Sequence, residues 1–244
     1  MFLIALILTL FLPNTAPAQT QREKGVVTIQ ILYRGTVPPP AVMKVTRDVE
    51  ICGTSMPLQS LTVHSSSGGL KDAVVMIEGI PLPDTEQTPP PPMVRVLSNA
   101  RCAFSPHVMP LRTGSPLEIH NQDPVMHNTH ITNDVRTFIN VAMVAKARPV
   151  VKKVEKPGLY RVQCDAHKFM RGYVLAAEHP YFGVTDERGY TRILNVPPGN
   201  HEISVWHEQL GPLQAHVTVP ANGEVAVTLE YSEDRAHHGN RTNK

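Results

Sequence analysis

Residues able to bind a soft metal ion stand close together in the C-terminal half of the chain. Cys164, His167 and Met170 form a Cys-x2-His-x2-Met segment, and His127 precedes them. Together they offer one thiolate, two imidazoles and one thioether, which suits a copper ion with two His and one Cys in a plane and a weak axial Met. A tight turn would direct the three closely spaced side chains to one point. The residues therefore predict a copper centre that changes oxidation state with little rearrangement.

Other interpretations of these residues remain open. A buried cysteine or methionine is often plain core packing, and a zinc site would want more Cys, His or carboxylate ligands in place of a thioether. His120 and His130 could each replace His127, although the pair His127-Asn128 favours His127. An enzyme with several copper ions would need clustered histidines such as His-x-His, which the sequence lacks. We therefore expect an electron carrier and no enzymatic activity.

Short strands separated by turns are the elements that must position these residues. Alternating β-branched and apolar residues predict strands at 25–33, 72–80, 117–121, 158–164 and 173–177. The segment 165–172 is then a loop between two strands, and it carries His167 and Met170. The 23 prolines are about twice the ordinary ~5% share, which disfavours helices. The chain is therefore expected to be all-β and to form a sandwich.

The metal-binding motif resembles that of a known family. The order His…Cys-x2-His-x2-Met, with the strand PGLYRVQC leading into it, is similar to the cupredoxins, and the loop CDAHKFMRGYV is especially similar to their amicyanin branch. The resemblance implies a Greek-key cupredoxin β-sandwich that holds one type 1 copper ion. Four residues would be its ligands: His127, Cys164, His167 and Met170. Three more would support the ligands through hydrogen bonds: Asn121, Asp123 and Asn128.

The same resemblance implies a function and a copper domain at residues 19–178. Such a domain would pass single electrons between redox proteins, for example a cytochrome and a dehydrogenase. Cys164 would carry the electron path, and His167 would be the ligand nearest to solvent, where a partner docks. The proline-rich stretch 35–92 is longer than a minimal cupredoxin needs. A copper-trafficking protein and an envelope carbohydrate-binding β protein are the alternatives.

Residues 179–231 resemble a second, smaller module. The segment YFGVTDERGY, followed by NVPPGN, is similar to carboxypeptidase regulatory-like domains, which are prealbumin-like β-sandwiches. The resemblance implies a structural or binding role without catalysis. A copper domain followed by such a module is methylamine-utilisation-protein-like. From residue 232 to 244 the chain is polar, and we expect a disordered tail.

The chain has 3 cysteines, so two remain once Cys164 is assigned to the metal. A disulfide between Cys52 and Cys102 would close a loop of about 50 residues and stabilise the fold by ~4 kcal/mol on the chain-entropy model. We favour this pairing over two free thiols. A second metal site formed by Cys102 and His107 is a weaker alternative.

The first eighteen residues indicate export. An apolar run at 2–12 is followed by Ala16-Pro17-Ala18, the pattern that signal peptidase cleaves. The run is shorter than the ~20 apolar residues that span a bilayer, so we expect a periplasmic or secreted protein without stable membrane insertion. A retained N-terminal anchor is the alternative. The 23 basic and 21 acidic residues give a net charge of +2 without a basic run, which argues against binding to nucleic acid.

Overall fold

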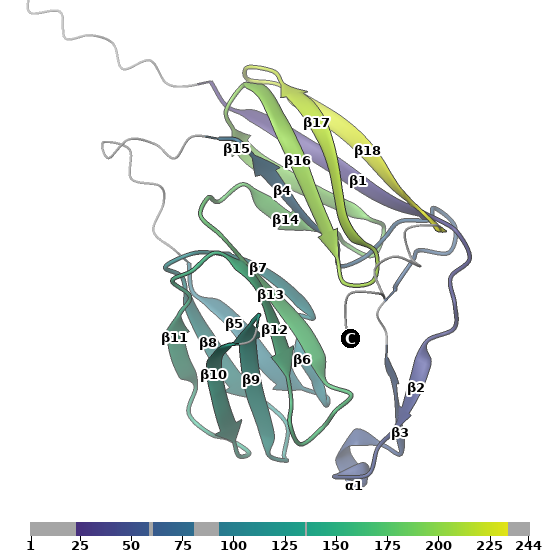
Figure 1. Cartoon of the computed structure of the whole chain (residues 1–244), viewed down its shortest axis with the longest axis vertical. Helices are drawn as coiled ribbons and strands as arrows, with labels where there is room; N and C mark the ends of the chain where they lie inside the picture. Colours follow the sequence, from purple (N-terminus) through teal and green to yellow (C-terminus); the bar gives the residue numbers. More distant parts are fainter. Residues whose placement is uncertain (1–22, 59–60, 81–92, 135, 234–244) are drawn as a thin grey trace, which may run out of the picture.

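Two groups of β-sheets build the molecule, one above the other in the view of Figure 1. The computed structural model describes residues 23–58, 61–80, 93–134 and 136–233. Within these ranges every regular element is a β-strand except one helix of four residues, so the predicted all-β class is confirmed. The expected signal peptide at 1–18 lies outside the described residues, and so does most of the expected tail. None of the described helices is long or apolar enough to cross a bilayer.

The first group, which we call the ligand sandwich, is built from one continuous stretch of chain. Its strands are β5 (Arg95–Ala100), β6 (Ala103–Ser105), β7 (Val108–Arg112), β8 (Pro116–Asn121), β9 (His127–Asn133), β10 (Arg136–Met143), β11 (Val150–Lys153), β12 (Gly158–Gln163) and β13 (Arg171–Ala177). They form a five-stranded sheet in the order β10-β9-β12-β13-β7 and a four-stranded sheet in the order β11-β8-β5-β6. Fully buried Leu117, Ile119, Ile131 and Val162 lie in the core of this sandwich.

The second group, the terminal sandwich, combines strands from both ends of the described chain. Its strands are β1 (Gly25–Arg34), β4 (Val74–Glu78), β14 (Phe182–Val184), β15 (Tyr190–Val196), β16 (Gly199–His207), β17 (Gly211–Val219) and β18 (Glu224–Ser232). They form sheets in the orders β15-β1-β18 and β14-β4-β16-β17. Ser232, where we expected the tail to begin, is the last residue of β18.

Two strands from the expected copper domain at 19–178, β1 and β4, therefore belong to the same sheets as the strands that follow residue 178. β1 runs parallel to β18 from Val26 opposite Glu224 to Arg34 opposite Ser232, and β4 pairs with β14 and β16. The burial pattern of β1 explains why it needs these neighbours: Val27, Ile29 and Ile31 are fully buried and require a sheet to cover them. No hairpin turn in the sequence signals a parallel pairing between segments so far apart.

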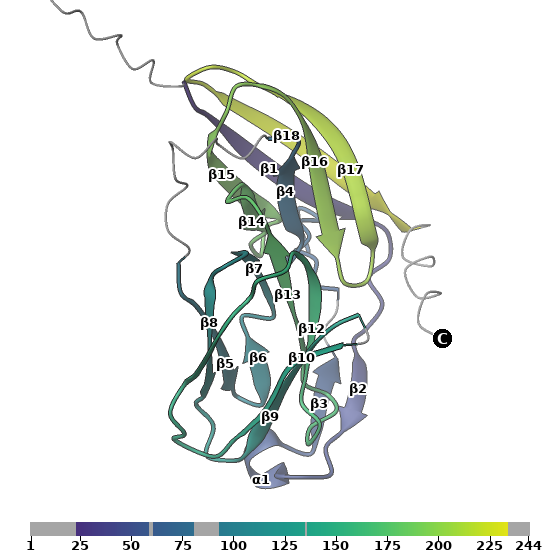
Figure 2. The ribbon, with the colours of Figure 1, turned by 60° about the vertical axis from the view of Figure 1, so that its left-hand side comes forward.

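A small segment between β1 and β4 lies against the end of the ligand sandwich that is remote from the terminal sandwich (Figures 1 and 2). It contains β2 (Ala41–Lys44), α1 (Val49–Cys52) and β3 (Ser55–Leu58), and we call it the cap. The two strands pair antiparallel. Cys52 forms a disulfide with Cys102 of the ligand sandwich, the pairing that we favoured from the sequence. Val45 and Cys52 are buried in the core of that sandwich, so the cap is part of its packing.

Polar and aromatic side chains join the two sandwiches. His107 of the ligand sandwich pairs with Glu208 at 2.5 Å between Nε2 and Oε1, and the Tyr173 ring meets the Trp206 ring edge-on with 5.0 Å between centroids. Burial, followed by the nearby Glu208 carboxylate, raises the pKa of Tyr173 to about 12, so its hydroxyl stays protonated. Buried Val74, Val108 and Leu175 form an apolar cluster of their own. The sandwiches therefore meet through specific contacts as well as through the chain that connects them.

Candidate metal centre

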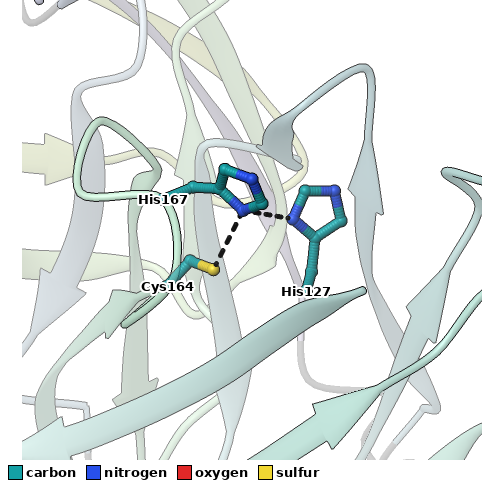
Figure 3. Close-up of side chains that lie close together, drawn as sticks. All are labelled: His127, Cys164 and His167. Carbon is teal, nitrogen blue, oxygen red and sulfur yellow. Dashed lines mark hydrogen bonds between the residues drawn. The ribbon is translucent and has the colours of Figure 1, made fainter. Parts of the chain in front are cut away.

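The ligand sandwich brings three of the expected ligands together at one end. His127 is the first residue of β9, and Cys164 and His167 lie on the loop that joins β12 to β13. β9 and β12 are antiparallel neighbours, with His130 opposite Gln163, so the beginning of β9 lies beside the end of β12. One ring nitrogen of each histidine and the Cys164 sulfur lie within 4.8 Å of one another. Figure 3 shows the two rings and the thiol facing a common point.

Short distances and deep burial define this cluster. The Nδ1 atoms of His127 and His167 are 3.1 Å apart, and the Cys164 sulfur is 3.6 Å from the His167 Nδ1. The exposed fractions are 0% for His127 and 1% for each of the other two residues. Water therefore has little access to the donor atoms.

The loop itself is held as a compact turn. The Met170 N–H donates to the His167 carbonyl at 2.9 Å, and the Cys164 N–H donates to the Met170 carbonyl at 3.4 Å. Met170, the fourth expected ligand, is 2% exposed and packs in the same core as Cys164. These backbone bonds fix the positions of all three motif residues on one turn.

The outer nitrogen of each histidine is bonded to a carboxylate. His127 Nε2 donates to Asp123 Oδ2 at 2.9 Å, and His167 Nε2 donates to Asp48 Oδ2 at 3.0 Å. A carboxylate partner assigns the proton to Nε2 and leaves Nδ1 with a free lone pair. Two such lone pairs at 3.1 Å repel each other, and a cation bound between them would relieve that repulsion.

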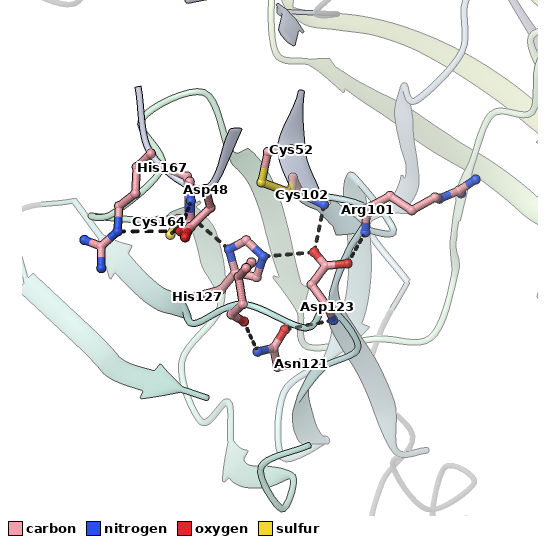
Figure 4. The surroundings of a disulfide bond; sticks show 11 residues. Asp48, Cys52, Arg101, Cys102, Asn121, Asp123, His127, Cys164 and His167 are labelled. Atoms are coloured by element: carbon pink, nitrogen blue, oxygen red, sulfur yellow. Dashed lines mark hydrogen bonds and ion pairs between the residues drawn. A yellow bond between two sulfur atoms is a disulfide. The ribbon is translucent and has the colours of Figure 1, made fainter. Parts of the chain in front are cut away.

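Asp123 is fixed in turn by its own neighbours (Figure 4). Its two oxygens accept the backbone N–H groups of Arg101 at 2.6 Å and Cys102 at 2.8 Å. Its own N–H donates to Asn121 Oδ1 at 3.2 Å, while the Asn121 amide donates to the Met143 carbonyl at 2.8 Å. Two of the three residues expected to support the ligands therefore form one network behind His127.

Asn128, the third expected supporting residue, connects β9 to the ligand loop. Its backbone N–H donates to the Cys164 sulfur at 3.4 Å, and its side-chain oxygen accepts the Asp165 N–H at 2.5 Å. Its amide also donates to the Asn140 side chain. A hydrogen bond to a ligand sulfur is one of the features that tune the potential of a copper–thiolate site.

Electrostatics favour a neutral His127 ring. Burial is the largest cause and lowers its pKa; the hydrogen bond to Asp123 opposes burial, and the neighbouring His167 acts in the same direction as burial. A neutral imidazole is the form that binds a metal ion. Its Nδ1 is therefore available for coordination at neutral pH.

The other candidate metal ligands lie apart from this cluster. His120 pairs with Glu118 at 3.2 Å, and His130 contacts Asp165 at 3.3 Å, so neither replaces His127. Cys102 does lie within 4.8 Å of Asp123 and His127, but its sulfur belongs to the disulfide and is no thiolate. His107, the possible partner of Cys102 in a second site, instead contacts Glu208 between the sandwiches.

His167 differs from our expectation in one respect. We expected its ring edge to reach solvent, but the side chain is buried and its outer nitrogen is bonded to Asp48 of the cap. Asp48 is the site residue that sequence reasoning missed, because it lies in a segment without a motif and is far from the ligands in the chain. The only sequence signal was the extra length of 35–92.

The donor set fits copper better than zinc. One cysteine sulfur and two imidazole nitrogens converge as a buried triangle, with a methionine on the same loop, which is the ligand pattern of a His2Cys copper site. A structural zinc site would require four tetrahedral Cys, His or carboxylate ligands. The Asp123 and Asp48 carboxylates are instead bonded to the outer histidine nitrogens.

Comparisons with known proteins find likeness only among solved structures. No protein-family model matches the chain, and no curated protein matches it. Amicyanin from Paracoccus versutus is 19% identical with a TM-score of 0.31, over 34% of this chain and 79% of its own. A purple cupredoxin from Nitrosopumilus maritimus is 18% identical with a TM-score of 0.30, over 34% of this chain and 98% of its own. A copper-containing nitrite reductase from Thermus scotoductus is 18% identical with a TM-score of 0.31, over 42% of this chain and 26% of its own.

Proposed function

We propose that the chain binds one copper ion through His127, Cys164 and His167, with Met170 as a weak axial ligand, and passes single electrons between redox proteins. The observation that supports this proposal most is the convergence of a thiol and two Nδ1 atoms in one buried cluster. Each Nδ1 is left unprotonated by a carboxylate on the opposite side of its ring. Copper bound there supplies a one-electron couple between Cu(I) and Cu(II).

The protein's own groups would serve this chemistry by keeping the donors still. β9 and β12 pair directly beside the cluster, and the loop carries backbone bonds that hold His167 and Met170 in place. The Asn128 N–H stabilises negative charge on the Cys164 sulfur. A rigid, dry site moves little between oxidation states, which favours fast electron transfer.

The same geometry argues against the rival function of copper trafficking. A trafficking protein has to hand its ion to another protein, which requires ligands that a partner can reach. Here the cluster residues are at most 1% exposed. A buried cluster instead suits an ion that stays while electrons move.

We further propose that the protein works outside the cytoplasm, without enzymatic activity. The Cys52–Cys102 disulfide supports this location, because such bonds persist in oxidising compartments. The copper domain would consist of the ligand sandwich together with the cap. The terminal sandwich, including the 179–231 module, would be a structural or binding addition. A cytochrome or a dehydrogenase is the class of partner that we expect.

Voltammetry in the presence of a Cu(I)-specific chelator tests electron transfer against trafficking. We expect one reversible one-electron wave that persists over repeated cycles, with the copper retained. His127→Gln should lose the wave, whereas His120→Gln, which alters a partly buried histidine outside the cluster, should keep it. Transfer of the copper to the chelator on the first reduction of the wild-type protein would contradict the proposal.

A further inference from the structure

The cap places a carboxylate on a proposed copper ligand. Asp48 Oδ2 lies 3.0 Å from His167 Nε2, and the His167 side chain is 1% exposed. Figure 4 shows Asp48 and Asp123 on opposite sides of the cluster, each bonded to the outer nitrogen of one histidine. The segment that we expected only to be an insertion thus completes the surroundings of the second histidine.

The backbone around Asp48 shows that this contact is more than a by-product of helix capping. Asp48 occupies the N-cap position of α1, where aspartate ordinarily accepts a backbone N–H with its side chain. No such side-chain bond is present here, and the Asp48 carbonyl alone accepts the Ile51 and Cys52 N–H groups at 3.0 and 2.8 Å. The carboxylate is therefore directed to His167 and to the Arg47 guanidinium at 3.5 Å.

The disulfide links this carboxylate to the other one. Cys52 ends the helix that Asp48 begins, and it is bonded to Cys102. The Cys102 N–H donates to Asp123 Oδ2 at 2.8 Å, and that same oxygen accepts His127 Nε2. A continuous path thus joins Asp48, α1, the disulfide and Asp123, with one histidine at each end.

We propose that Asp48 is a positioning residue of the metal centre, and that the disulfide-tethered cap encloses His167 instead of leaving it open to a docking partner. Asp48 holds the ring with Nδ1 toward Cys164 and keeps the proton on Nε2. This proposal rests on the proposed function only in taking the cluster to be the metal site. Outer carboxylates on ligand histidines are commonly worth 10–100-fold in metal affinity.

Substitutions at Asp48 can be chosen so that the cap still folds. The residue has φ 53° and ψ 38°, a left-handed conformation that glycine adopts freely and asparagine tolerates. Asp48→Gly removes the carboxylate, and Asp48→Asn keeps an acceptor oxygen without the charge. Glu50→Gln is the matched control, since it removes an exposed carboxylate from the same helix. Thiol counting on denatured, metal-free protein verifies the tether, because an intact disulfide leaves one reactive thiol.

Two measurements test the proposal. In copper competition titrations we expect Asp48→Gly to weaken copper affinity about 10–100-fold. The affinity of Asp48→Asn should lie between those of Asp48→Gly and the wild type, and that of Glu50→Gln should equal that of the wild type. In NMR of the metal-free protein, the His167 Nε2–H signal should be protected from exchange in the wild type and lost in Asp48→Gly. Unchanged affinity and an unchanged Nε2–H signal in Asp48→Gly would overturn the proposal. If the wild-type protein binds no copper, and the His167 Nε2–H signal is still lost in Asp48→Gly, the proposed function is refuted. The positioning contact between Asp48 and His167 is then still supported.

Discussion

The two sandwiches have similar apolar cores but differ in the polar side chains that they bury. Two buried polar residues belong to the terminal sandwich, Thr185 and His207, and both bond to the backbone: the Thr185 hydroxyl donates to the Leu70 carbonyl at 2.6 Å, and His207 Nδ1 accepts the Gln209 N–H at 3.3 Å. The ligand sandwich buries Ser98, Asn99, Ser115, Asn121, Asp123, His127, Asn128, Thr129 and His167. Several of these bond to one another and surround one cluster of donor atoms.

This difference separates polar groups that hold a fold together from those that prepare a site. Burying a polar group costs free energy unless it is hydrogen-bonded. In the terminal sandwich, hydrogen bonds from the two buried side chains to the backbone offset that cost. In the ligand sandwich the bonds run outward from His127 through Asp123 to Cys102, which fixes where a ring nitrogen points. The comparison therefore predicts that changes in the two regions have different consequences.

The largest expected effect on stability comes from the disulfide. The double change Cys52→Ala and Cys102→Ala should lower the free energy of unfolding of the ligand sandwich by about 4 kcal/mol on the chain-entropy model, since the bond closes a loop with sequence separation 50. Urea titration followed at Tyr160 and other ligand-sandwich signals by NMR measures this loss. The control is wild-type protein with its disulfide reduced, whose free energy of unfolding should match that of the double variant. Equal stability of the oxidised wild type and the variant would show that the tether contributes nothing.

The second effect is an acid sensitivity of the terminal sandwich. Burial, followed by the nearby His107, lowers the pKa of His207 from 6.5 to about 4. The unfolded chain then binds a proton below about pH 6.5, while the folded protein binds it only near pH 4, so stability falls as the pH drops through this window. The loss should approach about 3 kcal/mol at most, at 1.36 kcal/mol per pKa unit.

His207→Gln provides the control for that effect. It removes the titrating ring, so the free energy of unfolding of terminal-sandwich signals should change less between pH 7 and pH 4.5 than in the wild type. Denaturant titrations at the two pH values measure the difference. An identical pH dependence in both proteins would assign the acid sensitivity to other groups.

The smallest effect concerns the surface of the parallel β1–β18 pair. Arg34 Nη2 lies 2.9 Å from Glu230 Oε1, but both side chains are about half exposed, at 54% and 50%. Solvent screens such pairs, so Glu230→Gln should change the free energy of unfolding by less than about 1 kcal/mol, and less still at high salt. A loss above about 2 kcal/mol in urea titration would mean that this ion pair is needed to join the two ends of the chain.

The sequence predicted those parts of the molecule that are coded locally. Cys164 and His167 lie within one loop, so their spacing alone indicated that they meet. Asp123 precedes His127 by four residues across a short turn, and its bond to that ring could also be anticipated. These contacts depend on neighbours in the chain rather than on long-range packing.

Long-range pairings could not be predicted in the same way. The β1–β18 pair joins the two ends of the described chain, and the Asp48–His167 bond joins residues 119 positions apart. Neither has a turn or a periodic pattern that specifies its partner. The exposure of His167 was therefore wrongly expected, because the residue that covers it lies in a stretch where the sequence showed only unusual length.

The most direct test of the central claim is the visible spectrum of the protein loaded with one equivalent of Cu(II). Thiolate-to-copper charge transfer requires a short bond between the Cys164 sulfur and the ion, so the wild type should be intensely coloured. Cys164→Ser should lose that absorption while its far-ultraviolet circular dichroism stays unchanged, and His207→Gln in the terminal sandwich should keep the colour. A colourless wild type that takes up zinc in preference to copper, or a colour that survives in Cys164→Ser, would contradict the account.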